Sequence, residues 1–149
     1  MPDRRTARAE AFTDLILEVF KFRGELERHG KRIVQPFGQT PTRWLVLGGI
    51  DEAPRPVPQI ARRMGVTRQA VQRVADQLVK DGLARFDHNP DHRRSSLLTL
   101  TTRGGQVLSR INAAQAGWSN AIAEALTLED LRAAIRTIKA ATNRLRGTV

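Results

Sequence analysis

The segment 58–74 restricts the fold of this chain more than any other part of the sequence. Ala61 lies four residues before Gly65, and Val71 and Val74 follow that glycine by six and nine residues. A small residue at the first position lets two helices approach closely, and glycine readily adopts the positive φ of a tight turn. The two valines then fall on the buried face of the following helix. This spacing predicts a helix-turn-helix.

Two helices are predicted before this segment. Apolar residues recur at helical spacing over 12–26, which indicates a long first helix that ends near Gly30. Residues 31–39 are expected to form a connection, because proline and glycine interrupt them. Thr40 followed by Pro41 is typical of a helix start, since the hydroxyl caps free amides and proline fits the first turn. A short second helix is expected there.

The second helix of the helix-turn-helix should begin after a cap at Thr67 and end at Gly82. Residues 83–87 and 96–100 then have the character of two short strands. Between them, the polar and turn-rich residues 88–95 are typical of a hairpin tip. A basic hairpin after a helix-turn-helix is the arrangement called a winged helix.

The chain ends in two further amphipathic stretches, at about 107–126 and 127–147. The predicted fold class is therefore mainly α (α+β), one compact domain per chain. Residues 40–104 would form a winged helix-turn-helix region. Residues 1–39 and 105–149 would form a helical region built from both ends of the chain.

Composition favours an anionic partner. The 149 residues carry a formal net charge of +10, with a pI near 11.5, which suits nucleic acid or, less often, an acidic membrane surface. The chain has no cysteine, which excludes disulfides and thiolate metal ligands. The sequence shows no signal peptide and no apolar run long enough to cross a membrane. We expect a soluble cytoplasmic protein without a membrane partner.

The outer face of the second helix offers the groups that read DNA. A helix fits the major groove, where arginine suits guanine and glutamine suits adenine. The candidates for base and backbone contact are Thr67, Arg68, Gln69, Gln72 and Arg73. Capping alone is the simpler role for Thr67. A merely solvated helix face is the alternative for the rest, and the agreement of glycine turn and apolar spacing argues against it.

The hairpin tip would place Arg93 and Arg94 on a protruding loop. Arginine on a narrow arm can enter the minor groove, where the potential is most negative over A·T-rich sequence. Asp91 could organise this loop through an Asx turn or by holding Arg93. An ordinary charged hairpin is the alternative. The position directly after a recognition-type helix favours the DNA role.

These motifs resemble those of the MarR family of winged-helix regulators. The resemblance covers about 40–104 and rests most specifically on Asp-x-Arg in the hairpin and Leu-Thr-x-x-Gly after it, together with the helix-turn-helix pattern. It implies a homodimer whose terminal helices interleave into a dimerisation domain, a pseudo-palindromic double-stranded DNA operator and, often, release by a small ligand. It also implies a minor-groove role for Arg93 and an organising role for Asp91. Thiol sensing, found in one branch of the family, is excluded by the lack of cysteine.

Other chemistry has weaker support. Trp44, Phe12, Phe37 and Trp118 are candidates for a pocket that takes a small apolar or aromatic ligand, although aromatic residues at helical spacing are more often plain core. His88 and His92 are separated by a proline, so a metal pair is not expected. The sequence shows no catalytic constellation and no cofactor motif. We therefore expect neither an enzyme nor a metalloprotein.

The sequence as a whole predicts a homodimeric, sequence-specific transcriptional regulator, more a repressor than an activator, released by a small molecule. The alternative is a winged-helix module that docks on another protein and binds DNA weakly without sequence preference.

Overall fold

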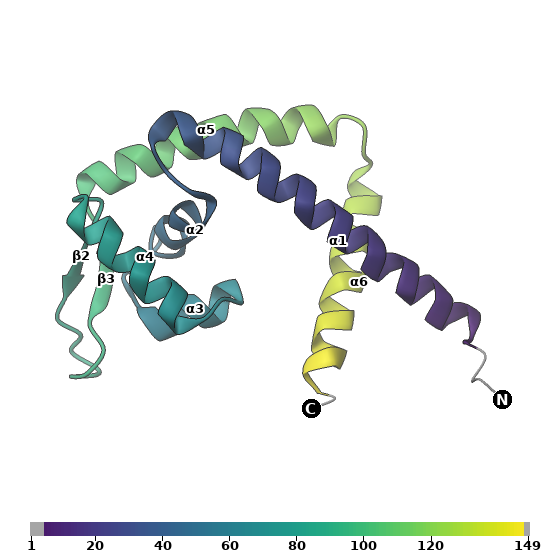
Figure 1. Cartoon of the computed structure of the whole chain (residues 1–149), viewed down its shortest axis with the longest axis horizontal. Coiled ribbons are helices and arrows are strands. Elements are labelled where there is room, and N and C mark those ends of the chain that lie inside the picture. The colour runs from purple at the N-terminus through teal and green to yellow at the C-terminus, as the bar shows by residue number, and fades with distance from the viewer. Residues whose placement is uncertain (1–4, 148–149) are drawn as a thin grey trace. The chain divides into compact units, whose positions relative to one another are not determined.

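The computed structural model describes residues 5–147, and its contacts divide the chain into two compact units, Met1–Ile111 and Asn112–Val149. Helices dominate, with one three-stranded antiparallel sheet (Figure 1). The predicted fold class is confirmed. The elements in chain order are α1 (Ala7–Val34), the 3-10 helix η1 (Gln35–Phe37), α2 (Pro41–Gly49), β1 (Arg55–Pro56), α3 (Val57–Met64), α4 (Arg68–Lys80), β2 (Ala84–Asp87), β3 (Leu97–Leu100), α5 (Thr102–Ala123) and α6 (Leu128–Arg146).

The first helix is longer than its sequence pattern suggested. The predicted end near Gly30 is wrong, because α1 continues to Val34, whose side chain is fully buried. Gly30 does not have a positive φ, so it stays within the helix. A Cβ built on it would lie 3.7 Å from Pro41 Cγ, so the helix passes the start of α2 closely at this point. The connection predicted at 31–39 is therefore shorter and consists of η1 and a left-handed turn at Gly38.

The starts of α2 and α4 follow the predicted caps, whereas α3 begins at Val57 without a side-chain cap and α5 begins at Thr102, earlier than the predicted stretch. The Thr40 hydroxyl accepts a hydrogen bond from the Arg43 amide at 3.2 Å, and α2 begins with Pro41. The Thr67 hydroxyl accepts one from the Ala70 amide, also at 3.2 Å, at the start of α4. Each cap supplies a partner for an amide that the helix itself leaves unpaired.

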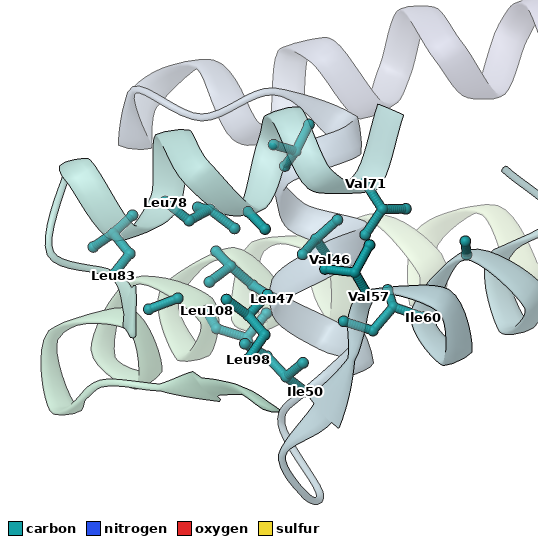
Figure 2. Packing of buried hydrophobic residues seen from close by; sticks show 14 residues of the cluster. Val46, Leu47, Ile50, Val57, Ile60, Val71, Leu78, Leu83, Leu98 and Leu108 are labelled. Carbon is teal, nitrogen blue, oxygen red and sulfur yellow. The ribbon is translucent and has the colours of Figure 1, made fainter. Parts of the chain in front are cut away.

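The core of the first unit lies among α2, α3, α4, the sheet and the start of α5. Figure 2 shows Leu47 of α2 beside Leu98 of β3 and Leu108 of α5, with Val71 and Leu78 reaching in from α4. All of these side chains are almost completely buried. The valine spacing that defined the helix-turn-helix therefore does place one face of α4 in the core.

The sheet has the order β1-β3-β2. The predicted hairpin is confirmed: Ala84 pairs with Leu100 and Asp87 with Leu97 in antiparallel register. The two-residue strand β1 was not predicted. It contains a proline and has no periodicity, and it pairs with β3 only because the chain returns there.

The hairpin is joined to the start of α5 through Thr101 and Gly104. The Thr101 amide donates to the Leu83 carbonyl at 3.2 Å, and the Thr101 hydroxyl donates to the Gly82 carbonyl at 2.7 Å. A Cβ built on Gly104 would lie 1.9 Å from the Leu83 carbonyl oxygen, a separation that no real side chain can have. The Leu-Thr-x-x-Gly pattern is thus the joint between β3, α5 and the end of α4.

The second unit comprises the end of α5 and the helix α6. The Thr127 hydroxyl caps α6 by accepting from the Asp130 amide at 3.1 Å, as predicted. Within the described residues, α6 has no buried side chain. Its apolar residues are open to solvent in the single chain, and Ile135 and Leu145 are 53% and 62% exposed.

Candidate nucleic-acid interface

The polar residues predicted on α4 do lie on its outer face. Arg68, Gln69, Gln72 and Arg73 are all exposed, opposite a buried row that contains Val71. Helical periodicity produces this separation, because residues three and four apart share a face. Thr67 is exposed as well, and its hydroxyl serves as the cap.

The turn before α4 fixes how the helix is presented. Gly65 has φ 66°, in the left-handed region, and its amide donates to the Ala61 carbonyl. The Val66 amide donates to the same carbonyl at 3.1 Å. This closes α3 with the glycine motif expected at a helix end. At the other end of α4, the Arg43 guanidinium of α2 holds the Asp81 carboxylate at 2.6 Å.

The loop between β2 and β3, residues 88–95, is the wing. Arg93 and Arg94 are exposed there, as predicted. An Asx turn was one of the two roles considered for Asp91, but Asn89 forms one here: its side-chain oxygen accepts from the Asp91 amide at 3.1 Å, and its side chain is nearly buried. Among residues 5–147 the Asp91 carboxylate has no hydrogen bond or ion pair, so it does not hold Arg93 here. An organising role for Asp91 is left as a proposal for the DNA-bound wing.

A groove lies between the start of α4 and the wing. Its volume is about 560 Å³, and it brings together Arg68, Gln69 and Gln72 from the helix with Arg94 from the wing. Apolar side chains of the helix-turn-helix and the sheet form its floor: Val57, Pro58 and Phe86. Arg73 lines a separate shallow hollow along the outer side of α4. Arg93 is not among the residues that line either space.

The exposed arginines of α4 and of the wing loop have no acidic partner among the described residues. Residues 57–96 contain eight basic and four acidic residues. In the part of the chain that the structure describes, no ion pair involves Arg68, Arg73, Arg93 or Arg94. Their charge is therefore available to a phosphate backbone, the main source of affinity in nucleic-acid binding.

Arg85 is different, because it is bound within the wing. Its guanidinium Nε lies 3.0 Å from the Asp87 carboxylate. The pKa of Asp87 is below its usual range, chiefly because the Thr99 hydroxyl is close by and secondarily because of Arg85.

Sequence reasoning missed two residues of this surface. Asp76 lies on the exposed face of α4 and accepts a hydrogen bond from the Gln72 amide at 2.9 Å. The four-residue spacing of this pair was visible in the sequence and is a known interaction distance on helices. Asn89, which forms the wing turn, was likewise signalled by the turn-forming pair that it makes with Pro90.

The four aromatic candidates for a ligand pocket lie on separate elements. Trp44 is half-buried against the core of the first unit, and Phe12 is exposed on α1. Phe37 lines a hollow of about 430 Å³ whose other residues include Arg43, Lys80 and Arg103. Trp118 belongs to the second unit. A shared pocket for these residues is therefore a proposal.

Residues 5–147 contain neither a metal-ligand cluster nor a membrane-spanning helix. The histidines and carboxylates of this range include no group of three or more that could hold a metal ion. None of its helices combines the length and apolar character that crossing a membrane requires.

Comparison with known proteins identifies the family. The model of the MarR family matches residues 37–95. The uncharacterized protein Rv2011c of Mycobacterium tuberculosis is 43% identical over 133 residues, which cover 85% of this chain and 93% of that protein.

Solved structures share the fold over nearly the whole chain. The transcriptional regulator BldR from Sulfolobus solfataricus superposes with a TM-score of 0.79 at 22% identity, over 92% of this chain and 99% of its own. The transcriptional repressor CouR, solved bound to a 23-mer DNA duplex, superposes with a TM-score of 0.75 at 25% identity, over 94% and 99%. The helix-turn-helix, the wing and these matches agree, and the chain belongs to the MarR family of winged-helix transcriptional regulators.

Proposed function

We propose that this chain is a homodimeric repressor that binds a pseudo-palindromic operator and is released by a small-molecule ligand. It would act in the cytoplasm, as a binding protein rather than an enzyme. The observation that carries the proposal is the groove between α4 and the wing, with its unpaired arginines on both sides.

On this proposal α4 enters the major groove. Gln69 and Gln72 have the amide groups that read adenine, and Arg68 has the guanidinium that reads guanine. Arg73 and the hydroxyl of Thr67 would contact phosphates. The fold of the repressor CouR, solved bound to a DNA duplex, matches along 94% of this chain, which supports DNA binding.

The wing would enter the adjoining minor groove. Arg93 and Arg94 are exposed on the wing, and the Asx turn of Asn89 shapes the loop that carries them. A narrow A·T-rich minor groove has the strongest negative potential, so these arginines would favour such sequence beside the bases that α4 reads.

A dimer explains the apolar surface of the terminal helices. In α1, Phe12, Ile16, Val19 and Leu26 are all at least 39% exposed and recur at helical spacing. In α6, Leu128, Ile135, Ile138 and Leu145 form a second such stripe, and none is buried in the single chain. Apolar stripes of this length are typical of protein interfaces. A second copy of the chain would cover them and would present two recognition helices to successive turns of the duplex, about 34 Å apart.

The ligand of such a regulator would be small and apolar or aromatic. Phe12, Phe37, Trp44 and Trp118 are the side chains proposed to receive it. A ligand that binds only one spacing of the two recognition helices would shift the dimer toward that spacing and lower its affinity for the operator.

The first test is a titration of the protein against its own upstream DNA and a scrambled duplex at several salt concentrations. A specific site is expected to bind at least about 10³-fold more tightly than the scrambled duplex at physiological salt. Equal and steeply salt-dependent binding to both duplexes would mean phosphate contact alone. That result would contradict the repressor and favour a winged-helix module that docks on another protein.

The dimer has a separate test. An Ile135→Glu substitution places a charge on the apolar stripe of α6, whereas Thr137→Glu places one on its other side. In analytical ultracentrifugation the first variant should dissociate to monomers at concentrations where the wild type and the second variant stay dimeric. Monomeric wild-type protein at micromolar concentration would overturn the homodimer.

A further inference from the structure

We propose that Asp76 sets the base preference of α4 by holding the Gln72 amide in one orientation. The inference rests on the proposed function, in which α4 enters the major groove. It assigns to Asp76 a positioning role and to Gln72 a definite choice of base.

The contact between the two residues fixes the amide. The Gln72 Nε2 donates to Asp76 Oδ1 at 2.9 Å, across one turn of α4, and both side chains are exposed. A carboxylate can only accept hydrogen bonds, so the amide NH₂ must face Asp76. The carbonyl oxygen Oε1 of Gln72 therefore points away from Asp76. A glutamine without such a partner rotates freely between its two amide orientations.

Within the described part of the chain, Asp76 has no cation to neutralise it. Arg73 lies three residues before it and Lys80 four residues after it, both at distances where helix side chains can meet. Among residues 5–147, neither forms an ion pair with Asp76, whose carboxylate is occupied by Gln72 instead. An unneutralised carboxylate on a surface that meets phosphates lowers affinity for any DNA. A gain in sequence discrimination would offset that loss.

The fixed amide matches adenine and opposes guanine. With one N–H bound to Asp76, Gln72 presents its carbonyl oxygen and its second N–H to the groove. Adenine offers the complementary pair, an amino donor and the N7 acceptor. Guanine offers two acceptors, O6 and N7, and the Gln72 oxygen would face O6 without a hydrogen between them. Releasing the amide would let its NH₂ turn toward guanine as well.

Four variants test whether Asp76 sets the base preference through the Gln72 amide: Asp76→Asn, Asp76→Glu, Gln72→Ala and the double variant of Asp76→Asn with Gln72→Ala. Asparagine accepts or donates, so it satisfies either orientation of the Gln72 amide, whereas glutamate keeps the acceptor-only carboxylate. Asp14→Asn removes the same charge from α1 and serves as the control. Each protein is used for site selection from random DNA and for competition binding with operator variants. Thermal unfolding checks that the exposed substitutions leave the fold intact.

The contacted base pair is the one whose preference disappears in the Gln72→Ala variant. There the wild type should favour adenine over guanine by about tenfold, the size of a good paired contact. The Asp76→Asn variant should lose most of this preference, and the double variant should lose no more than Gln72→Ala does alone. Asp76→Glu and Asp14→Asn should keep it. A general gain in affinity without a change in base preference would reflect charge alone and would overturn the proposal.

Failure of this inference is distinguishable from failure of the proposed function. A sequence preference that depends on Gln72 but is unchanged in Asp76→Asn would overturn the role of Asp76 and leave the repressor in place. Absence of any sequence preference in the wild type would overturn both.

Discussion

Adding one methyl group at Gly104 should destabilise the first unit more than any other glycine-to-alanine change in α5. A Cβ at this position would lie 1.9 Å from the Leu83 carbonyl oxygen and 3.0 Å from Leu100 Cδ1. The oxygen is backbone, so it cannot rotate out of the way. It also accepts the Thr101 amide at 3.2 Å, and that hydrogen bond would be lost if β2 and α5 moved apart.

The expected loss of stability is the sum of three terms, two that destabilise the variant and one that stabilises it. Overpacking of a filled interior typically costs about 1–3 kcal/mol, and the rigid backbone contact places Gly104→Ala at the upper end. Loss of the Thr101 hydrogen bond adds about 1 kcal/mol. Replacing glycine by alanine in a helix returns about 1 kcal/mol. We expect a net loss of about 3 kcal/mol in the free energy of unfolding.

Urea denaturation followed by circular dichroism measures this difference, at one fixed protein concentration because the stability of the proposed dimer would depend on it. The matched control is Gly105→Ala, one residue further along the same helix. Its Cβ would meet Leu100 Cδ2 at an ordinary 3.7 Å, so the variant should be as stable as the wild type or slightly more stable. Equal stability of the two variants would refute the close approach of α5 to Leu83.

Three further outcomes are expected. An Arg93→Ala substitution should weaken operator binding by about 1–3 kcal/mol in fluorescence anisotropy, mainly for operators with A·T-rich flanks. The control Arg136→Ala makes the same charge change on α6 and should leave binding unchanged. Unchanged binding by the Arg93→Ala variant would remove Arg93 from the mechanism. Replacing Thr67 by alanine should lower the free energy of unfolding by about 1 kcal/mol because α4 loses its cap. Serine keeps a hydroxyl at this position and should retain most of the stability of the wild type. An alanine variant with wild-type stability would contradict the cap. Since the pKa of Asp87 is lowered in the folded chain, its charge contributes stability above the usual pKa of an aspartate, and that contribution is lost as the pH falls through the lowered value. Acid titration of Asp87→Asn should therefore show a shallower loss of stability than the wild type, and identical acid profiles would argue against it.

Local signals explain why much of the fold was predictable. The caps at Thr40, Thr67 and Thr127 each act on an amide three residues away. The turn at Gly65 depends on the conformational freedom of one residue. Because these interactions are complete within a short segment, the sequence pattern alone located the starts of three helices and the turn between α3 and α4.

The candidate site was predictable only in part. Helical periodicity was enough to place Arg68, Gln69, Gln72 and Arg73 on one exposed face. It did not show that Gln72 would bind Asp76 rather than point freely to solvent, since several pairings of polar side chains are available on the same face. In the wing, asparagine and aspartate side chains such as those of Asn89 and Asp91 can both form Asx turns. Only the folded loop shows that Asn89 is the one that does so.

Features that join distant parts of the chain required the tertiary structure. The strand at Arg55 exists because the chain returns to pair it with Leu98, more than forty residues later. The helix α1 continues beyond Gly30, its predicted end, in a region where Gly30 lies close to Pro41 and Val34 is buried. The groove combines α3, α4 and the wing. Periodicity and caps are properties of neighbouring residues and are written in the sequence, whereas the meeting of distant segments depends on how the whole core packs.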